Sequence, residues 1–83
     1  MDFKRAANET LSIARVRRQL SAPAPSKTGL STGHAHWMLL QVAFSGLMTE
    51  AEACHWLGWA QCIFVRNGYN TMQEIQDINR RCK

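Results

Sequence analysis

Apolar residues recur at steps of three and four over the first twenty residues, and this spacing predicts an amphipathic helix over residues 3–20. One apolar stripe consists of Phe3, Ala7, Leu11 and Ala14. A second stripe, on another side, consists of Ile13, Val16 and Leu20. Because the apolar surface shifts round the helix, we expect either two contact surfaces or a helix that packs only in part.

Residues 21–33 predict a linker, because they contain two prolines, two glycines, many hydroxyl side chains and only one large apolar residue, Leu30. Pro23 and Pro25 favour an extended backbone. We therefore expect the first helix either to be held away from the rest of the chain or to dock back across it.

Residues 34–44 are apolar on nearly every side of a helix, which is typical of a buried helix. Ser31 or Thr32 is suited to cap its start, and Gly46 is suited to end it in a left-handed conformation.

Two capping boxes mark the start of the last two helices. Thr49 with Glu52, and Thr71 with Glu74, have the spacing at which a hydroxyl and a carboxylate satisfy each other's end amides. We expect these helices to run from 49 to 67 and from 71 to 82. The apolar stripe of the last helix consists of Met72, Ile75, Ile78 and Cys82.

No segment alternates as a half-buried strand would, so the fold class is all-α. We predict a compact three-helix core over residues 34–83, preceded by a basic N-terminal helix (residues 1–20) on a Pro/Gly/Ser linker (residues 21–33). A single domain of this length buries only about 60–65% of the surface that its unfolded chain exposes. We therefore expect a partner or a second copy to contribute to its stability.

The net charge of +4 is concentrated near the start of the chain. The first 27 residues contain six basic and two acidic residues, whereas the remainder contains four of each. Such an imbalance attracts an acidic partner. No apolar run is long enough to cross a bilayer, and no apolar segment follows the basic N-terminus as in a secretory signal. We therefore expect no membrane contact and a cytoplasmic location.

A helix-turn-helix is one candidate motif, because residues 49–58 resemble its first helix and turn glycine. A recognition helix needs several donors to read bases, yet residues 59–65 offer only Gln61. This favours one continuous helix in which Gly58 lets a neighbouring helix approach closely.

Metal binding and nucleophilic catalysis are poorly supported. The histidines and cysteines lack the close pairs typical of zinc sites. Cys54 and Cys62 lie about 80° apart on a helix, and the adjacent Cys54 and His55 diverge. We predict no metal, no cofactor and no enzymatic activity. Three cysteines in a chain without a secretory signal predict reduced, mostly buried thiols.

The basic N-terminal helix is the expected binding surface. Its charges are Lys4, Arg5, Arg15, Arg17 and Arg18, and its apolar anchors are Leu11, Val16 and Leu20. The apolar residues favour a protein with an acidic surface, because an arm that follows phosphates would need few of them. Trp56 and Trp59 lie three residues apart, and core packing and an interface anchor are both open to them.

The segment from His55 to Gln61, followed by a glycine turn and a Thr-x-x-Glu helix, resembles short accessory proteins of tailed phages and prophages that carry a Trp-Leu-Gly-x-x-Gln helix. The similarity covers about residues 47–80 and rests mainly on helix caps and core positions. It implies a phage origin and no particular activity.

Together these features predict a protein-binding module: a phage-encoded inhibitor or modulator of a bacterial host nucleic-acid-processing or defence complex. The alternatives are a small nucleic-acid-binding regulator, which would use the same arginines with Arg66, and a homo-oligomeric structural protein.

Overall fold

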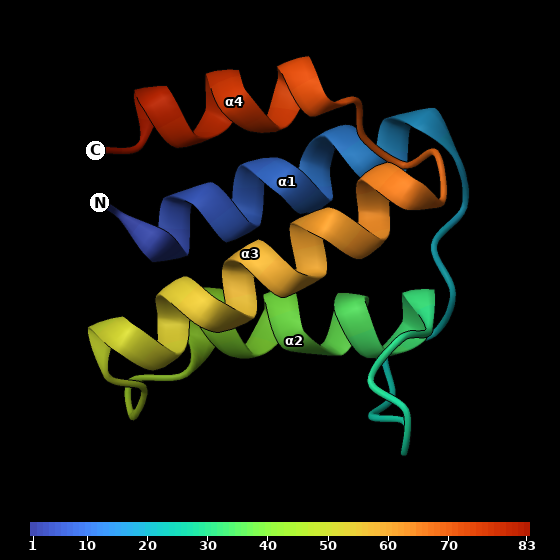
Figure 1. Ribbon diagram of the computed structural model, residues 1–83, viewed down its shortest axis with the longest axis horizontal. Coiled ribbons are helices and arrows are strands. Elements are labelled where there is room, and N and C mark those ends of the chain that lie inside the picture. The colour runs from blue at the N-terminus through green and yellow to red at the C-terminus, as the bar shows by residue number, and fades with distance from the viewer.

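The computed structural model describes all 83 residues, which form helices and connecting loops but no strand. Its four helices are α1 (Phe3–Arg17), α2 (Thr32–Phe44), α3 (Glu50–Arg66) and α4 (Met72–Arg81). Figure 1 shows α4 beside α1 at the top, α3 crossing diagonally and α2 at the bottom. The all-α prediction is confirmed. None of the helices has both the length and the apolarity that crossing a bilayer requires.

Helix α1 lies at the centre of the molecule, where it contacts all three other helices. Ala6, Ala7, Leu11 and Ala14 are completely buried in a single apolar core that the four helices share. The predicted core of three helices, preceded by the N-terminal helix, is therefore not confirmed, because α1 belongs to the same core. Alanine carries a weak hydrophobic signal, yet its small side chain allows neighbouring helices to come close, so the pattern understated how much of α1 is buried.

Helix α1 also ends earlier than the pattern predicts. Asp2 caps its start, and its side chain accepts a hydrogen bond from the Arg5 backbone amide. Arg18 leaves the helix with an extended backbone, at φ −163° and ψ 160°, so residues 18–20 are not helical. At the other end of the chain, the Cys82 carbonyl accepts a hydrogen bond of 2.5 Å from the Asp2 amide. This bond joins the start of α1 to the end of α4.

The predicted helix starts are confirmed, whereas one predicted stop is wrong. Both capping boxes form in full, and Ser31 caps α2. Gly68 adopts φ +79° directly after α3, as expected of a helix stop. Gly46 does not adopt a positive φ. Instead α2 ends at Phe44, and the amide of its C-cap residue Ser45 donates to the Gln41 carbonyl.

The linker docks back across the helices. The Ser26 amide donates to Nδ1 of His34 at 2.9 Å, and Nδ1 of His36 lies 2.8 Å from the Ser21 carbonyl. Both histidines therefore fasten the linker to the start of α2. A further hydrogen bond, from the Trp59 indole of α3 to the Gly29 carbonyl, joins the linker to α3.

A buried polar network connects three of the helices, and the sequence pattern did not indicate it. Gln61 of α3 and Asn79 of α4 exchange two amide hydrogen bonds of 3.0 and 3.1 Å, and Gln61 also donates to the Thr10 hydroxyl of α1 at 3.1 Å. Asn70, in the turn between α3 and α4, donates to the Thr10 carbonyl at 3.3 Å. These directional bonds set the spacing between α3 and α4.

Candidate interaction surface

Much of the predicted binding surface on α1 is occupied by contacts within the molecule. Leu11 is 0% exposed, so it cannot anchor a partner while the protein is folded. The Arg17 guanidinium binds both carboxylate oxygens of Glu74, at 2.5 and 2.9 Å, and donates to the Tyr69 carbonyl. Arg18 donates to the Asn67 carbonyl at 2.8 Å and lies 4.9 Å above the Tyr69 ring. Arg17 and Arg18 therefore hold the turn between α3 and α4 against α1.

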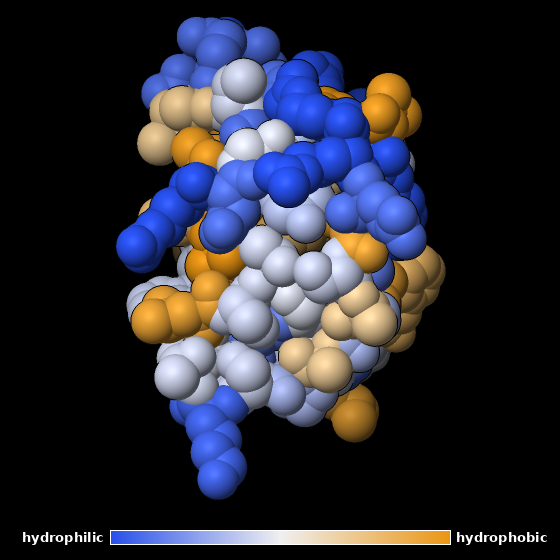
Figure 2. Space-filling model, turned by 90° about the vertical axis from the view of Figure 1, so that its right-hand side faces the viewer, coloured by the Kyte–Doolittle hydropathy of each residue, from blue (hydrophilic) through white to orange (hydrophobic).

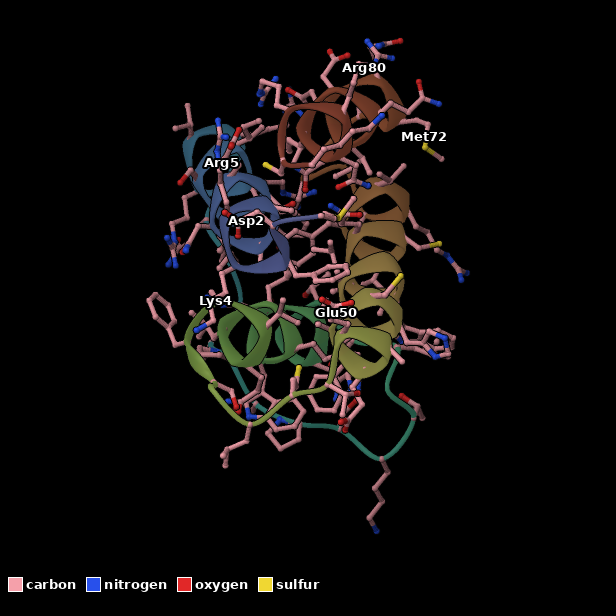
Figure 3. The ribbon with its side chains drawn as sticks, turned by 90° about the vertical axis from the view of Figure 1, so that its left-hand side faces the viewer. Asp2, Lys4, Arg5, Glu50, Met72 and Arg80 are labelled. Atoms are coloured by element: carbon pink, nitrogen blue, oxygen red, sulfur yellow. The ribbon has the colours of Figure 1, made fainter.

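The other predicted residues of α1 are more dispersed. Arg5 pairs with Glu9 at 2.9 Å, and Leu20 is half-buried. Lys4, Arg15 and Val16 are exposed, and Val16 is 89% exposed. Figure 3 shows Lys4 and Arg5 at the end of the molecule where the chain begins. Arg15 and Val16 lie near the other end of α1, so these free residues form no common patch with Lys4.

The paired arginines perturb two carboxyl groups. The bidentate hydrogen bond from Arg17 lowers the pKa of Glu74 from 4.5 to about 2, and the Thr71 amide adds to this effect. Hydrogen bonds from Arg81 and Cys82 lower the pKa of Glu9. Both carboxylates thus stabilise the packing of α4 on α1.

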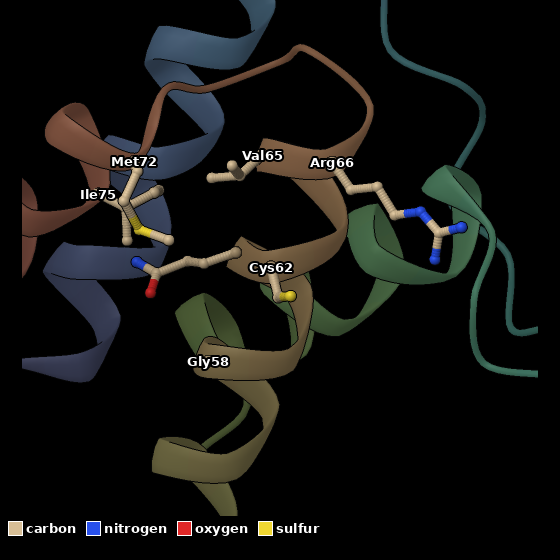
Figure 4. Close-up of a pocket in the computed structure, with 7 residues that line it drawn as sticks. Gly58, Cys62, Val65, Arg66, Met72 and Ile75 are labelled. Atoms are coloured by element: carbon tan, nitrogen blue, oxygen red, sulfur yellow. The ribbon is translucent and has the colours of Figure 1, made fainter.

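A different surface, formed mainly by α3 and α4, is apolar and open. Its main cavity has a volume of about 300 Å³. That cavity is lined by Gly58, Gln61, Cys62, Val65, Arg66, Met72 and Ile75. Figure 4 shows it between the second half of α3 and the start of α4. Seen from the end in Figure 3, Met72 projects from α4 on the side of the molecule where α3 lies.

A second cavity of about 110 Å³ adjoins the first, because Cys62 and Arg66 line both. Leu30 of the linker and Trp59 of α3 complete this part. We call the combined surface the α3–α4 face. Its members are Leu30, Gly58, Trp59, Gln61, Cys62, Ile63, Val65, Arg66, Met72 and Ile75.

The exposed side of α3 is unusual in carrying almost no charge. Between Glu52 and Arg66 the exposed residues are Cys54, His55, Gly58, Trp59 and Cys62. A solvent-facing helix surface normally carries lysines and acidic residues. The composition of this side is instead that of a surface that another molecule covers.

Gly58 lies open on the α3–α4 face. A Cβ atom at this position would meet no atom of the protein within 4 Å, so the expected close approach of a neighbouring helix is wrong. Glycine within a helix costs about 0.5–1 kcal/mol relative to alanine. The packing of the molecule itself therefore gives no reason for glycine here.

The two tryptophans of α3 have different environments. Trp56 is half-buried and packs against Trp37, with ring centroids 5.3 Å apart, so it belongs to the packing between α2 and α3. Trp59 is 50% exposed, and its indole N–H donates to the Gly29 carbonyl at 2.7 Å. This bond fixes the ring at the edge of the α3–α4 face, next to Leu30.

Two of the three thiols are exposed, which corrects the expectation that most are buried. Cys54 and Cys62 lie on the open side of α3, whereas Cys82 is buried. Burial raises the pKa of the Cys82 thiol, as does its hydrogen bond to Glu9. No group of three or more histidine, cysteine or acidic side chains is placed to hold a metal ion.

Positive charge gathers at the end of the molecule where α1 and α3 finish. Figure 2 views this end and shows hydrophilic side chains over its upper part, with apolar side chains at the margins. Arg15 and Arg66 are exposed there and take part in none of the four ion pairs. Arg66 brings this charge to the edge of the α3–α4 face.

The α3–α4 face was not predicted as a binding surface. Of its members, Trp59 was named as a possible interface anchor, and Arg66 was named only for the nucleic-acid-binding alternative. A usable signal was present, because residues 53–65 contain no lysine, arginine, aspartate or glutamate. The apolar residues of that run divide between core and surface only once the helix is placed against α1 and α2. Compared with known proteins, the chain matches no described protein family, no curated protein sequence and no solved structure.

Proposed function

We propose that this protein is a binding module that holds another protein against its α3–α4 face. The observation that carries the proposal is Gly58, which lies open in the middle of an uncharged helix surface beside an apolar cavity. An exposed apolar surface rimmed by polar residues marks interaction sites in small proteins. Trp59 and Arg66, both of residue types enriched at binding hot spots, line the adjoining smaller cavity.

The face is also better suited to a protein than to nucleic acid. A phosphate backbone is bound by several free lysines or arginines, whereas Arg66 is the only charged residue that lines either cavity. Arg17 and Arg18, which a nucleic-acid interface would need, are held by Glu74 and by backbone carbonyls.

A more specific part of the proposal concerns the partner. Following the resemblance of residues 47–80 to phage accessory proteins, we propose that the partner belongs to a bacterial host nucleic-acid-processing or defence complex. The protein would then act in the host cytoplasm as an inhibitor or modulator.

The test is affinity capture from a bacterial lysate with three forms of the protein. Cys62→Glu places a charge at the centre of the α3–α4 face. Val16→Glu is the matched control, because Val16 is also exposed but lies on α1. We expect Val16→Glu and the unaltered protein to recover the same proteins, and Cys62→Glu to lose them. Equal recovery by all three forms would exclude this face as the binding site.

A further inference from the structure

We infer that the α3–α4 face accepts an amphipathic helix from a partner protein, with a carboxylate of that helix against Arg66. This inference rests on the proposed function and names the chemistry of the partner. Helices that bind in this way lay their apolar side into a groove and use side chains three and four residues apart as anchors.

The shape of the face fits a helix lying along α3. Gly58, Cys62 and Arg66 are spaced by four residues, so they follow one side of α3 over about 12 Å, or two helical turns. Gly58 has no side chain to keep a partner backbone away. Beside it, the cavity of about 300 Å³ ends on Met72 and Ile75 of α4 and has room for large apolar side chains of the partner.

The floor of the groove is held in place by the polar network of the core. Gln61 lines the cavity, but its amide group is engaged by Asn79 and Thr10. An apolar side chain that enters the cavity therefore leaves no hydrogen-bonding group of Gln61 newly unsatisfied. A rigid, already bonded floor reduces the free energy that ordering the site would cost on binding.

The charge of the partner follows from Arg66. Its guanidinium has no ion-pair partner and stands at the edge of a face without any carboxylate. An acidic side chain of the partner can therefore bind the Arg66 guanidinium, because no carboxylate of this protein already pairs with it. A second copy of the same face would bring another arginine and no carboxylate, so charge complementarity favours a different, acidic protein over self-association.

The experiment uses two fluorescein-labelled amphipathic peptides with the same leucine-rich side, one carrying glutamates and the other lysines on its polar side. Fluorescence anisotropy gives their affinities for the full chain. We expect the glutamate peptide to bind more tightly by on the order of fivefold, because an exposed ion pair replaces a repulsion. Arg66→Glu should reverse this preference.

Two variants separate the site from general charge effects. Arg15→Glu makes the same charge change at an exposed, unpaired arginine of α1, and it should leave the preference between the peptides unchanged. Gly58→Gln places a long side chain across the groove without removing a contact, and it should weaken both peptides while thermal unfolding shows the fold intact. Equal binding of the two peptides, or a preference that Arg66→Glu leaves unchanged, would overturn the inference.

The result is distinguishable from failure of the proposed function. If Cys62→Glu abolishes capture but neither peptide binds, the face binds a protein of another kind and only this inference falls. If light scattering shows a dimer that Cys62→Glu dissociates, the occupant is a second copy and the acidic partner is excluded.

Discussion

Gly58 is a residue that the packing of the fold does not explain. We expect Gly58→Ala to raise the free energy of unfolding by about 0.5–1 kcal/mol, because alanine favours the helix and its Cβ meets no atom within 4 Å. Urea denaturation followed by tryptophan fluorescence measures the change. A loss of stability would mean that the fold itself requires glycine here.

The matched control is Gly68→Ala. Gly68 adopts φ +79°, where an L-amino acid is strained. Alanine there should lower the free energy of unfolding by about 1–2 kcal/mol. Alanine should therefore change the free energy of unfolding in opposite directions at the two positions, within α3 at Gly58 and after its end at Gly68.

Between elements, the strongest ionic contact is the one that Arg17 of α1 makes with Glu74 of α4. The pKa of Glu74 is lowered to about 2 from 4.5, so its charged form stabilises the folded state above pH 4.5, and this stability is lost as the pH falls towards 2. We expect the urea midpoint of the unaltered protein to fall across this range.

Glu74→Gln tests the origin of that pH dependence. Glutamine can replace glutamate in the capping box with Thr71, so the start of α4 is retained. The variant should be less stable than the unaltered protein at pH 6, and the difference should narrow by pH 3. The stability of the Glu74→Gln variant should still fall slightly as the pH is lowered, because the pKa of Glu9 is also lowered. A constant difference between the two proteins at all pH values would contradict the assignment.

At the level of elements, the helix starts were predictable because they depend on local chemistry. The hydroxyl and carboxylate of each capping box are three residues apart, so their spacing in the chain determines their contact. The end of α1 and the stop at Gly46 were predicted wrongly. The end of α1 coincides with a contact distant in the chain, from Arg18 to the Asn67 carbonyl, which no local pattern contains. At the end of α2, the Ser45 amide bonds to the Gln41 carbonyl and Gly46 has no positive φ.

At the level of the molecule, the position of α1 predicts that the chain does not fold without it. Removing residues 1–20 takes away the buried alanines and Leu11, and leaves Gln61 without its Thr10 partner. Residues 21–83 should therefore lose cooperative thermal unfolding, as measured by circular dichroism at 222 nm, a wavelength typical for helices. A sharp transition in this fragment would instead support an independent three-helix core.

The α3–α4 face was harder to predict than the helices, because it depends on how the whole molecule is arranged. Whether Trp59 and Cys62 are core or surface depends on which side of α3 meets α1 and α2, and that is decided by the whole arrangement. Arg17 and Arg18 present the opposite case. Their charge in the sequence predicted contact with another molecule, yet the groups that they bind lie about fifty residues away in the same chain.

The hydrogen bond between the Asp2 amide and the Cys82 carbonyl places the two ends of the chain side by side. A protein built in this way can be inserted as a guest into a surface loop of a host protein, because the host chain enters and leaves it at one point. The guest would keep all four helices, and the α3–α4 face would remain free to bind. The fold is thus a compact unit that a host protein could hold at a single point of its own chain.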